Sequence, residues 1–306
     1  MGKYREWTDR GVVFRHPPME PPWGGIFTSF PDPDGNSFSL VSFDKVSREV
    51  EEQRRLTSEK LEAERRTAGE LEIAREVQAR LFPQKMPLSE TLEYAGACFQ
   101  ARHVGGDYYD FLDLGHRRLG LVLADIAGKG IAAALLMANL QANLRSQCAI
   151  ASDQPEQFLR SVNELFYENT AAGDYATFFF SEYDDKLRRL RYANCGHLAP
   201  LLLRRDNTVE RLGSTATVLG TLPRLELFCR RTAALFRRTL ALYTDGMTES
   251  SNGKGEEFGE SLLAEALRRH RELPPEVLLS SVVDDVRQFS TGEQQNDVTL
   301  IVAKCR

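Results

Sequence analysis

The chain has 306 residues, of which 42% are hydrophobic and 27% charged, and its formal net charge is −5. This length suits one large domain with an ordinary buried core and a smaller segment beside it. The mild acidity excludes the basic surface that binds duplex nucleic acid. The longest apolar run, at 131–138, is too short to span a bilayer, and no charged-then-apolar leader is expected. We therefore expect a cytoplasmic protein with no nucleic-acid or membrane partner.

The five cysteines form no CxxC pair, and no histidine lies near them at the spacing that zinc sites use. They are Cys98, Cys148, Cys195, Cys229 and Cys305. We expect reduced, buried side chains. The alternative is a nucleophilic Cys195, because the neighbouring imidazole of His197 could lower the thiol pKa.

Residues 1–45 hold six of the thirteen prolines and both tryptophans, Trp7 and Trp23. Strand-like alternation surrounds a turn at 32–36. We predict a small β-rich segment that is too short to bury a core alone.

Residues 47–80 contain no proline, one glycine, and nine acidic and eight basic residues, which predicts a long solvated helix. Its apolar positions form an incomplete heptad pattern. Two interpretations stay open: a charged spacer, or a coiled coil through which the chain forms a homodimer. Pro83 should end the helix, because proline cannot extend the hydrogen-bond ladder. The segment 46–84 is thus predicted as a linker before a domain at 85–306.

From about residue 90, short β-like runs alternate with two pairs of helical stretches. Strands are predicted at 93–100, 119–125, 176–183, 187–194, 198–204, 239–244 and 298–304. Helices are predicted at 131–147, 155–170, 258–271 and 275–289. Successive strands stand too close together for parallel crossovers, so the predicted fold class is α+β, with antiparallel sheets and helices grouped outside them.

Four aspartates stand at the ends of apolar runs, and turns rich in glycine adjoin three of them. They are Asp107, Asp125, Asp245 and Asp297. Any one of them alone suits a turn or a helix cap. Four carboxylates in one cleft would repel one another and call for a cation. Oxygen ligands without histidine or thiolate suit Mg²⁺ or Mn²⁺, and two such ions would activate a water toward phosphorus.

Six sequence blocks resemble the bacterial SpoIIE/RsbU-like branch of the metal-dependent protein phosphatases (PPM). They lie at 77–83, 104–110 (VGGDYYD), 124–135 (ADIAGKGIAAAL), 194–200 (NCGHLAP), 243–249 (YTDGMTE) and 296–300 (NDVTL). Their order and spacing follow the family across about residues 73–304. The resemblance implies a β-sandwich of two antiparallel sheets flanked by helix pairs, with a two-metal site in the cleft between the sheet edges.

The resemblance also implies hydrolysis of phosphoserine or phosphothreonine on a protein, commonly an anti-sigma-factor antagonist of the STAS type. The nucleophile would be a metal-activated water, without a covalent phosphoenzyme. Carried over by position, Asp107 and Asp125 would hold the metal pair together with the carbonyl oxygen of Ile126. Asp245 would complete the second ion's shell. These three aspartates are the predicted catalytic residues, and Mn²⁺ or Mg²⁺ is the predicted cofactor.

The last block departs from the family pattern Asp-Asp-x-Thr, because Asn296 stands where the ligand is expected. Asparagine offers a neutral oxygen and removes one negative charge. Asp297 would point to the opposite face of a strand unless the backbone bulges. Three alternatives follow: weak ligation by Asn296, replacement by Asp297, or a loose second metal. The main hypothesis is an active phosphatase, and the alternative is a weak or inactive PPM-fold binding module in a partner-switching pathway.

Other polar residues of these blocks have two interpretations each. His197 either contacts substrate phosphate or bonds the backbone to shape its loop, and we favour the loop. Lys129 either joins a helix N-terminus that attracts an anion or is simply solvated. For Asp110 and Glu249 we expect turn or surface roles rather than ligation through water.

Residues 23–40 resemble the closing hairpin of a glyoxalase (vicinal oxygen chelate, VOC) module. Metal-using members carry glutamate where this chain has Ser39, so no metal is expected there. The segment is either a sensor or dimer-completing half-module, or a truncated remnant, which we favour. Two such halves could pair edge to edge in a homodimer, since an isolated hairpin is marginal in water.

Overall fold

The computed structural model describes residues 2–22, 24–42, 45–151, 153–171, 173–231, 238–292 and 294–306. They divide into two compact units, Met1–Glu70 and Leu71–Arg306. Trp23, which opens the glyoxalase-like block, lies outside the described residues. Within the described part of the chain, no helix is both long and apolar enough to cross a membrane.

The first unit contains helix α1 (Gly2–Asp9) and an antiparallel hairpin of β1 (Ile26–Pro31) and β2 (Ser37–Ser42). Aromatic rings join them, because Trp7 meets Phe30 edge-on at 5.4 Å between ring centroids. The hairpin turn is closed by the Asp32 carboxylate, which accepts hydrogen bonds from the backbone N–H groups of Asp34 and Asn36. The sequence analysis predicted this hairpin but not α1.

Helix α2 (Lys45–Ala79) begins in the first unit and ends in the second. It matches the helix predicted at 47–80 and stops four residues before Pro83. Its charged side chains form ion pairs one turn apart, such as Arg55 with Glu52 at 2.7 Å. Such exposed pairs each stabilise a helix by only about 0.3–0.5 kcal/mol. Val50, Leu56 and Leu61 are exposed along it.

The second unit contains two five-stranded antiparallel sheets, ordered β10-β7-β6-β5-β4 and β3-β12-β11-β8-β9. The strands of the first sheet are β4 (Tyr108–Asp113), β5 (Arg118–Ile126), β6 (Ala176–Asp184), β7 (Arg189–Cys195) and β10 (Arg230–Arg231). Those of the second are β3 (Leu92–Phe99), β8 (Leu201–Leu203), β9 (Val209–Arg211), β11 (Thr239–Tyr243) and β12 (Val298–Cys305). The predicted antiparallel sandwich is therefore confirmed.

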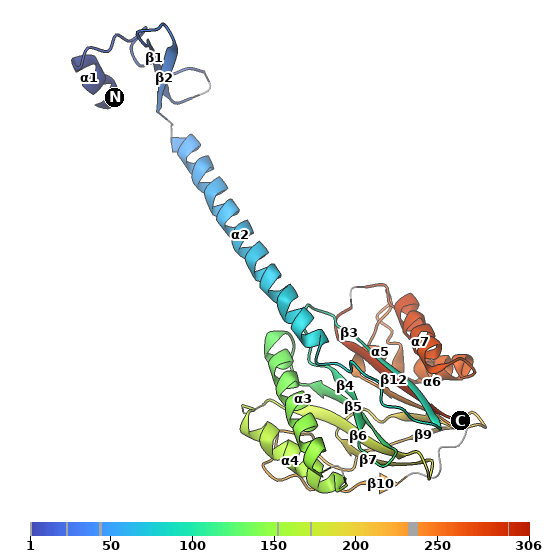
Figure 1. Cartoon of the computed structure of the whole chain (residues 1–306). Helices are drawn as coiled ribbons and strands as arrows, with labels where there is room; N and C mark the ends of the chain where they lie inside the picture. The colour runs from blue at the N-terminus through green and yellow to red at the C-terminus, as the bar shows by residue number, and fades with distance from the viewer. Residues whose placement is uncertain are drawn as a thin grey trace. The chain divides into compact units, whose positions relative to one another are not determined.

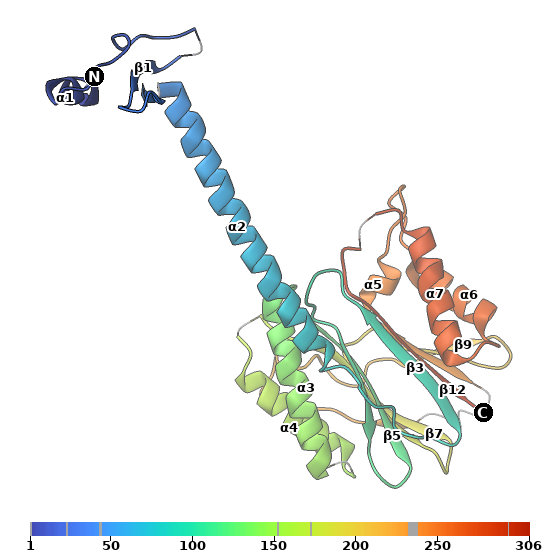
Figure 2. The same cartoon turned by 45° about the horizontal axis from the view of Figure 1, so that its top comes forward.

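Helices cover the two outer faces of this sandwich (Figures 1 and 2). The first sheet is covered by α3 (Ile131–Ala151) and α4 (Pro155–Glu168), and the second by α6 (Gly259–His270) and α7 (Pro275–Phe289). A third buried layer, including Leu121, Phe179 and Ile301, fills the space between the sheets. Both α4 and α7 begin with proline at their first helical position, where the missing N–H has no intrahelical partner to lose.

Several elements differ from the predicted ranges. Strand β4 was not predicted; its residues directly follow the glycine pair at 105–106. The strand predicted at 198–204 shortens to Leu201–Leu203. The four-residue helix α5 (Asp245–Thr248) begins where a turn was expected.

Candidate active site

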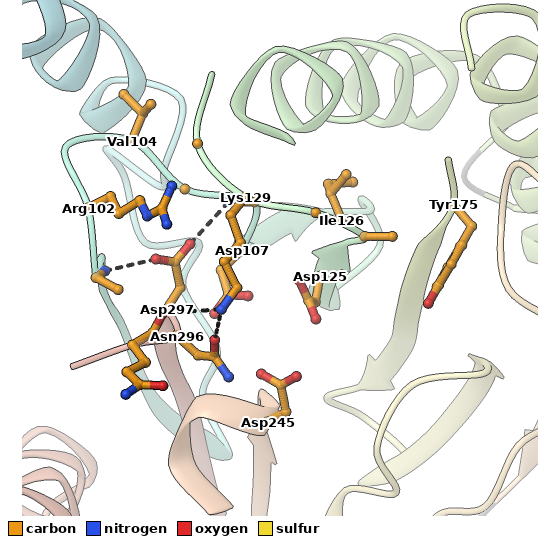
Figure 3. A pocket seen from close by; sticks show the side chains of 17 residues that line it. Arg102, Val104, Asp107, Asp125, Ile126, Lys129, Tyr175, Asp245, Asn296 and Asp297 are labelled. Carbon is orange, nitrogen blue, oxygen red and sulfur yellow. Dashed lines mark hydrogen bonds between the residues drawn. The ribbon is translucent and has the colours of Figure 1, made fainter. Parts of the chain in front are cut away.

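A pocket of about 290 Å³ opens between the edges of the two sheets (Figure 3). Each of the four predicted aspartates lines it: Asp107, Asp125, Asp245 and Asp297. Asp107 directly precedes β4, Asp125 ends β5, Asp245 opens α5, and Asp297 directly precedes β12. Segments distant in sequence thus bring four carboxylates to one space, and those of Asp125 and Asp245 face one another across it.

Asp107 forms the floor of the pocket and is buried. Its Oδ2 accepts hydrogen bonds from the hydroxyls of Thr244 (2.7 Å) and Thr299 (2.5 Å), one following β11 and one within β12. Burial, followed by the nearby charge of Asp125, raises the pKa of Asp107 well above its usual value. The hydroxyl pair therefore fixes the orientation of a carboxylate whose charge the protein leaves largely uncompensated.

Asp125 and Asp245 form the walls and are partly exposed. Burial and the charges of Asp245 and Asp297 raise the pKa of Asp125 to about 7. Burial likewise raises the pKa of Asp245, against the effects of the Gly246 N–H and Lys129. Shifts of this direction are expected where like charges share a site without a counter-ion.

Asp297 is held by backbone N–H groups on the opposite side of the pocket. Its Oδ1 accepts from Ala101 N at 2.8 Å and its Oδ2 from Gly106 N at 3.0 Å. This approach explains two glycines, because a Cβ at Gly105 would lie 1.9 Å from Asp297 Oδ2 and one at Gly246 would lie 2.1 Å from Asp297 O. No side chain fits at either position without displacing Asp297.

Asn296 lines the same pocket, but its amide is engaged elsewhere. Lys129 Nζ donates to its Oδ1 at 2.5 Å, and its Nδ2 donates to Glu249 Oε2 at 3.0 Å. The alternation argument that separated Asn296 from Asp297 does not apply, because β12 begins only at Val298 and both residues precede it. Lys129 is therefore not simply solvated.

Gln78, near the end of α2, is a site residue that sequence analysis missed, although it lies in the first resembling block. The side chain is buried and brackets the backbone of Gly105: Nε2 donates to Gly105 O at 2.8 Å, and Oε1 accepts from Gly105 N at 3.1 Å. The loop carrying Asp107 is thus tied to α2 within the second unit. A side-chain amide can replace a backbone partner in this way, but no local pattern announces it.

The oxygen atoms that line the pocket suit hard metal ions. Within the described residues, no three acidic, histidine or cysteine side chains already stand close enough together to enclose an ion. The pocket nevertheless offers oxygen ligands alone, from four carboxylates and the adjoining Ile126, and the raised carboxylate pKa values reveal uncompensated negative charge. Hard divalent cations such as Mg²⁺ and Mn²⁺ fit this chemistry after small side-chain movements.

Three further residues of the resembling blocks have structural roles. His197 is buried, and its Nε2 donates to Tyr243 O at 3.1 Å, which confirms the preferred interpretation that it shapes its loop. Cys195 is also buried, and burial raises the pKa of its thiol to about 12, which argues against the nucleophile alternative. Asp110 accepts two 2.8 Å hydrogen bonds from Arg145, which argues against a role for Asp110 as a metal ligand.

Comparisons with known proteins agree with this architecture. The profile of the family described as Stage II sporulation protein E (SpoIIE) matches residues 115–306. The phosphoserine phosphatase RsbU of Bacillus subtilis is 27% identical over 238 residues, covering 77% of this chain and 70% of RsbU. Protein IcfG of Synechocystis is also 27% identical, over 258 residues that cover 76% of this chain but only 41% of IcfG.

Two solved structures share the fold. The SiaA-PP2C domain of Pseudomonas aeruginosa superposes with a TM-score of 0.71 at 21% identity, covering 80% of this chain and 99% of that domain. The RsbU and RsbW domains of Rv1364c from Mycobacterium tuberculosis give a TM-score of 0.61 at 27% identity, covering 72% and 62%. The two-sheet sandwich of the second unit thus has the fold of a PP2C domain.

The chain belongs to the SpoIIE family, in the RsbU-like serine phosphatase branch of the metal-dependent protein phosphatases.

Proposed function

We propose that the chain removes phosphate from phosphoserine or phosphothreonine of a signalling protein, using two Mn²⁺ or Mg²⁺ ions bound in the pocket. The observation that carries this proposal is the convergence of Asp107, Asp125, Asp245 and Asp297 on one pocket. Two relatives, RsbU and RsbP of Bacillus subtilis, are phosphoserine phosphatases by name. Such ions, when bound, would lower the pKa of a water and polarise the phosphoryl group.

We assign the metal-binding oxygens to Asp107, Asp125, the Ile126 carbonyl and Asp245. For the remaining position we favour Asp297 over Asn296. Asp297 lines the pocket together with the other three aspartates, and beyond the effect of burial its charge raises the pKa of each of them, so it lies near them. The Asn296 amide instead holds the Lys129 ammonium group at the pocket.

Two cationic side chains at the pocket suit a phosphorylated side chain. Lys129 and Arg102 both line it and are exposed. Their charges would orient the phosphate of an incoming phosphoserine while the carboxylates hold the ions. The substrate class that we favour is a STAS-type anti-sigma-factor antagonist, because relatives include a protein with RsbU and RsbW domains and a stressosome component. We further propose a homodimer formed through α2 and the N-terminal unit.

The test is release of phosphate from a phosphoserine peptide while Mn²⁺ is titrated against EDTA. We expect Asp125→Asn and Asp245→Asn each to lower kcat/KM by about 10³-fold or more while the circular dichroism spectrum is kept. The matched control is Asp284→Asn, an exposed aspartate on α7 that should leave turnover unchanged. Full activity of both pocket variants in Mn²⁺ would refute the site.

A second candidate function is a phosphoprotein-binding module without turnover, and the engaged amide of Asn296 favours it. Under this hypothesis, the protein binds the phosphopeptide in Mn²⁺ but releases no phosphate. Asn296→Asp would then create activity, because it adds the missing negative charge. If the chain is an active phosphatase, the same substitution only lowers the Mn²⁺ concentration needed for half-maximal rate.

A further inference from the structure

A second pocket, of about 390 Å³, lies in the same unit and is lined mainly by basic residues. Among the described residues, its cationic side chains are those of Arg204, Arg205, Arg238, Arg271 and Lys304, and its one carboxylate is that of Glu272. The whole chain carries a net charge of −5, so this concentration of positive charge opposes the overall balance. We call this group of residues the basic pocket.

Strand register explains how the basic pocket forms. Leu203 of β8 pairs with Thr239 of β11, which pairs with Lys304 of β12. Arg204 directly follows the first of these residues and Arg238 directly precedes the second. Three neighbouring strands therefore bring cationic residues to one end of the sheet. On the same sheet, Asp245 and Asp297 lie past the other ends of β11 and β12, about 20 Å away at 3.3 Å per residue.

The cations of the basic pocket exceed the carboxylates available to them. Arg204 donates to Glu210 at 2.6 Å and Arg271 to Glu272 at 2.8 Å. Lys304 Nζ donates instead to two backbone carbonyls after α6, those of Arg271 and Leu273, each at 2.7 Å. Within the described part of the chain, no ion pair joins Arg205, Arg238 or Lys304 to a carboxylate. Three positive charges are thus left without an anionic partner.

Arg238 provides a second, independent observation, a donor atom without a partner. Its Nη1 is buried and finds no hydrogen-bond acceptor among the described residues. A buried donor without a partner costs about 1–3 kcal/mol, and more when it belongs to a charged group. In native proteins such a group usually has a partner, which is often an ion or a water. Because Arg238 lines the basic pocket, a turn of its side chain toward a bound anion would supply the missing acceptor.

We propose that the basic pocket binds a small anion carrying two or more phosphate groups. Guanidinium groups form paired hydrogen bonds to phosphate oxygens, and several of them together match more than one phosphate. No aromatic side chain lines the basic pocket among the described residues, so there is no surface on which a nucleobase would stack. The recognised feature is therefore the phosphate charge rather than a base. Inorganic pyrophosphate is the simplest probe with this chemistry.

The experiment is calorimetric titration of the full chain with pyrophosphate in EDTA at low ionic strength. We expect binding that weakens as salt is added. Arg238→Gln should raise the Kd about tenfold, and Arg205→Gln, on an exposed loop, about threefold. Orthophosphate should bind more weakly than pyrophosphate, and ADP no more tightly, because the adenosine gains no stacking partner.

Two controls separate the basic pocket from the phosphatase site. Arg65→Gln changes an exposed arginine of α2 and should leave the Kd unchanged. Asp245→Asn should also leave it unchanged, which makes this test independent of the proposed function. If Arg238→Gln does not fold, Arg205→Gln and the double variant Arg205→Gln with Arg271→Gln decide the question. The proposal is overturned if the wild-type chain does not bind millimolar pyrophosphate, or if only Asp245→Asn alters binding.

Discussion

Two regions of the second unit, Leu71–Arg306, differ in how the protein compensates the charge of their carboxylates. In the region around Asp185, after β6, the buried carboxylate accepts hydrogen bonds from Ser89 Oγ (2.7 Å), Thr91 N (2.9 Å) and Arg117 Nη2 (2.9 Å). In the pocket, four carboxylates line one space, and within the described residues none of them forms an ion pair.

The pKa values record this difference. Although burial acts to raise it, hydrogen bonds from Thr91, Ser89 and Arg117 lower the pKa of Asp185 well below its usual value. Burial and like charges raise the pKa of Asp107 and Asp125. The positive charge of Arg117 compensates the Asp185 carboxylate. The hydroxyl and backbone donors in the pocket bring no positive charge, so the negative charge there is left for a cation from solution.

The largest stability effect should come from breaking the satisfied region. Asp185→Ala removes the acceptor of hydrogen bonds from two segments, 89–91 and Arg117, so we expect a loss of about 3 kcal/mol in unfolding free energy. Urea denaturation measures it, with Asp284→Ala as the exposed control. Turnover per folded molecule should be unchanged. A loss below about 0.5 kcal/mol would contradict the assigned role.

The same network predicts how stability depends on pH. The pKa of Asp185 is lower in the folded state than in the unfolded chain. Its contribution is therefore fully present above the unfolded pKa, near 4, and is lost as the pH falls below it. The denaturation midpoint of the wild-type chain should fall more steeply over this acid range than that of Asp185→Ala. Equal slopes would show that Asp185 does not carry this dependence.

His197 is a second buried polar side chain whose hydrogen bonds are all made within the protein. Its ring accepts a 2.7 Å hydrogen bond from Thr177 Oγ1 and donates to Tyr243 O, and burial lowers its pKa to about 4. His197→Ala should cost about 2 kcal/mol, and His197→Gln less. The neutral ring stabilises the fold above the unfolded pKa of about 6.5, and this contribution is lost as the pH falls from there toward 4.

The surroundings of Asp185 also show what could not be predicted from the sequence. Long elements such as α2, α4 and α7 were predicted because their composition and periodicity are local properties. The four pocket aspartates were predicted because each stands at the end of an apolar run. Among the partners of Asp185, Ser89 lies 96 positions away, Thr91 94 and Arg117 68, so no local pattern indicated them.

The role of Gln78 and the orientation of Asp297 could not be derived from the sequence, for related reasons. The role of Gln78 depends on a loop 27 residues away. The orientation of Asp297 was argued from strand alternation, yet β12 begins one residue later. Where a strand starts is among the least certain features of a sequence, so side-chain facing at its edge could not be derived.

Gln78 places a fully hydrogen-bonded amide beside the pocket, where it holds the loop that carries Asp107. Gln78→Ala leaves both polar groups of Gly105 without this partner and should cost about 1–2 kcal/mol. Because Asp107 lies two residues further on, we also expect kcat to fall about tenfold with little change in KM for the phosphopeptide. Gln53→Ala, an exposed residue of the same helix, is the control. Unchanged kcat would limit Gln78 to a structural role.

The smallest expected effect has the opposite sign. Asp125→Asn removes one of the mutually repelling charges, so in EDTA at pH 8 the unfolding free energy should rise by about 1 kcal/mol. Wild-type protein should gain more thermal stability from Mn²⁺ than the variant does, because binding to the folded state stabilises by mass action. Comparing melting temperatures with and without Mn²⁺ measures both effects. A variant that is less stable than wild type in EDTA would show that Asp125 is satisfied as Asp185 is, and the distinction between the two regions would fail.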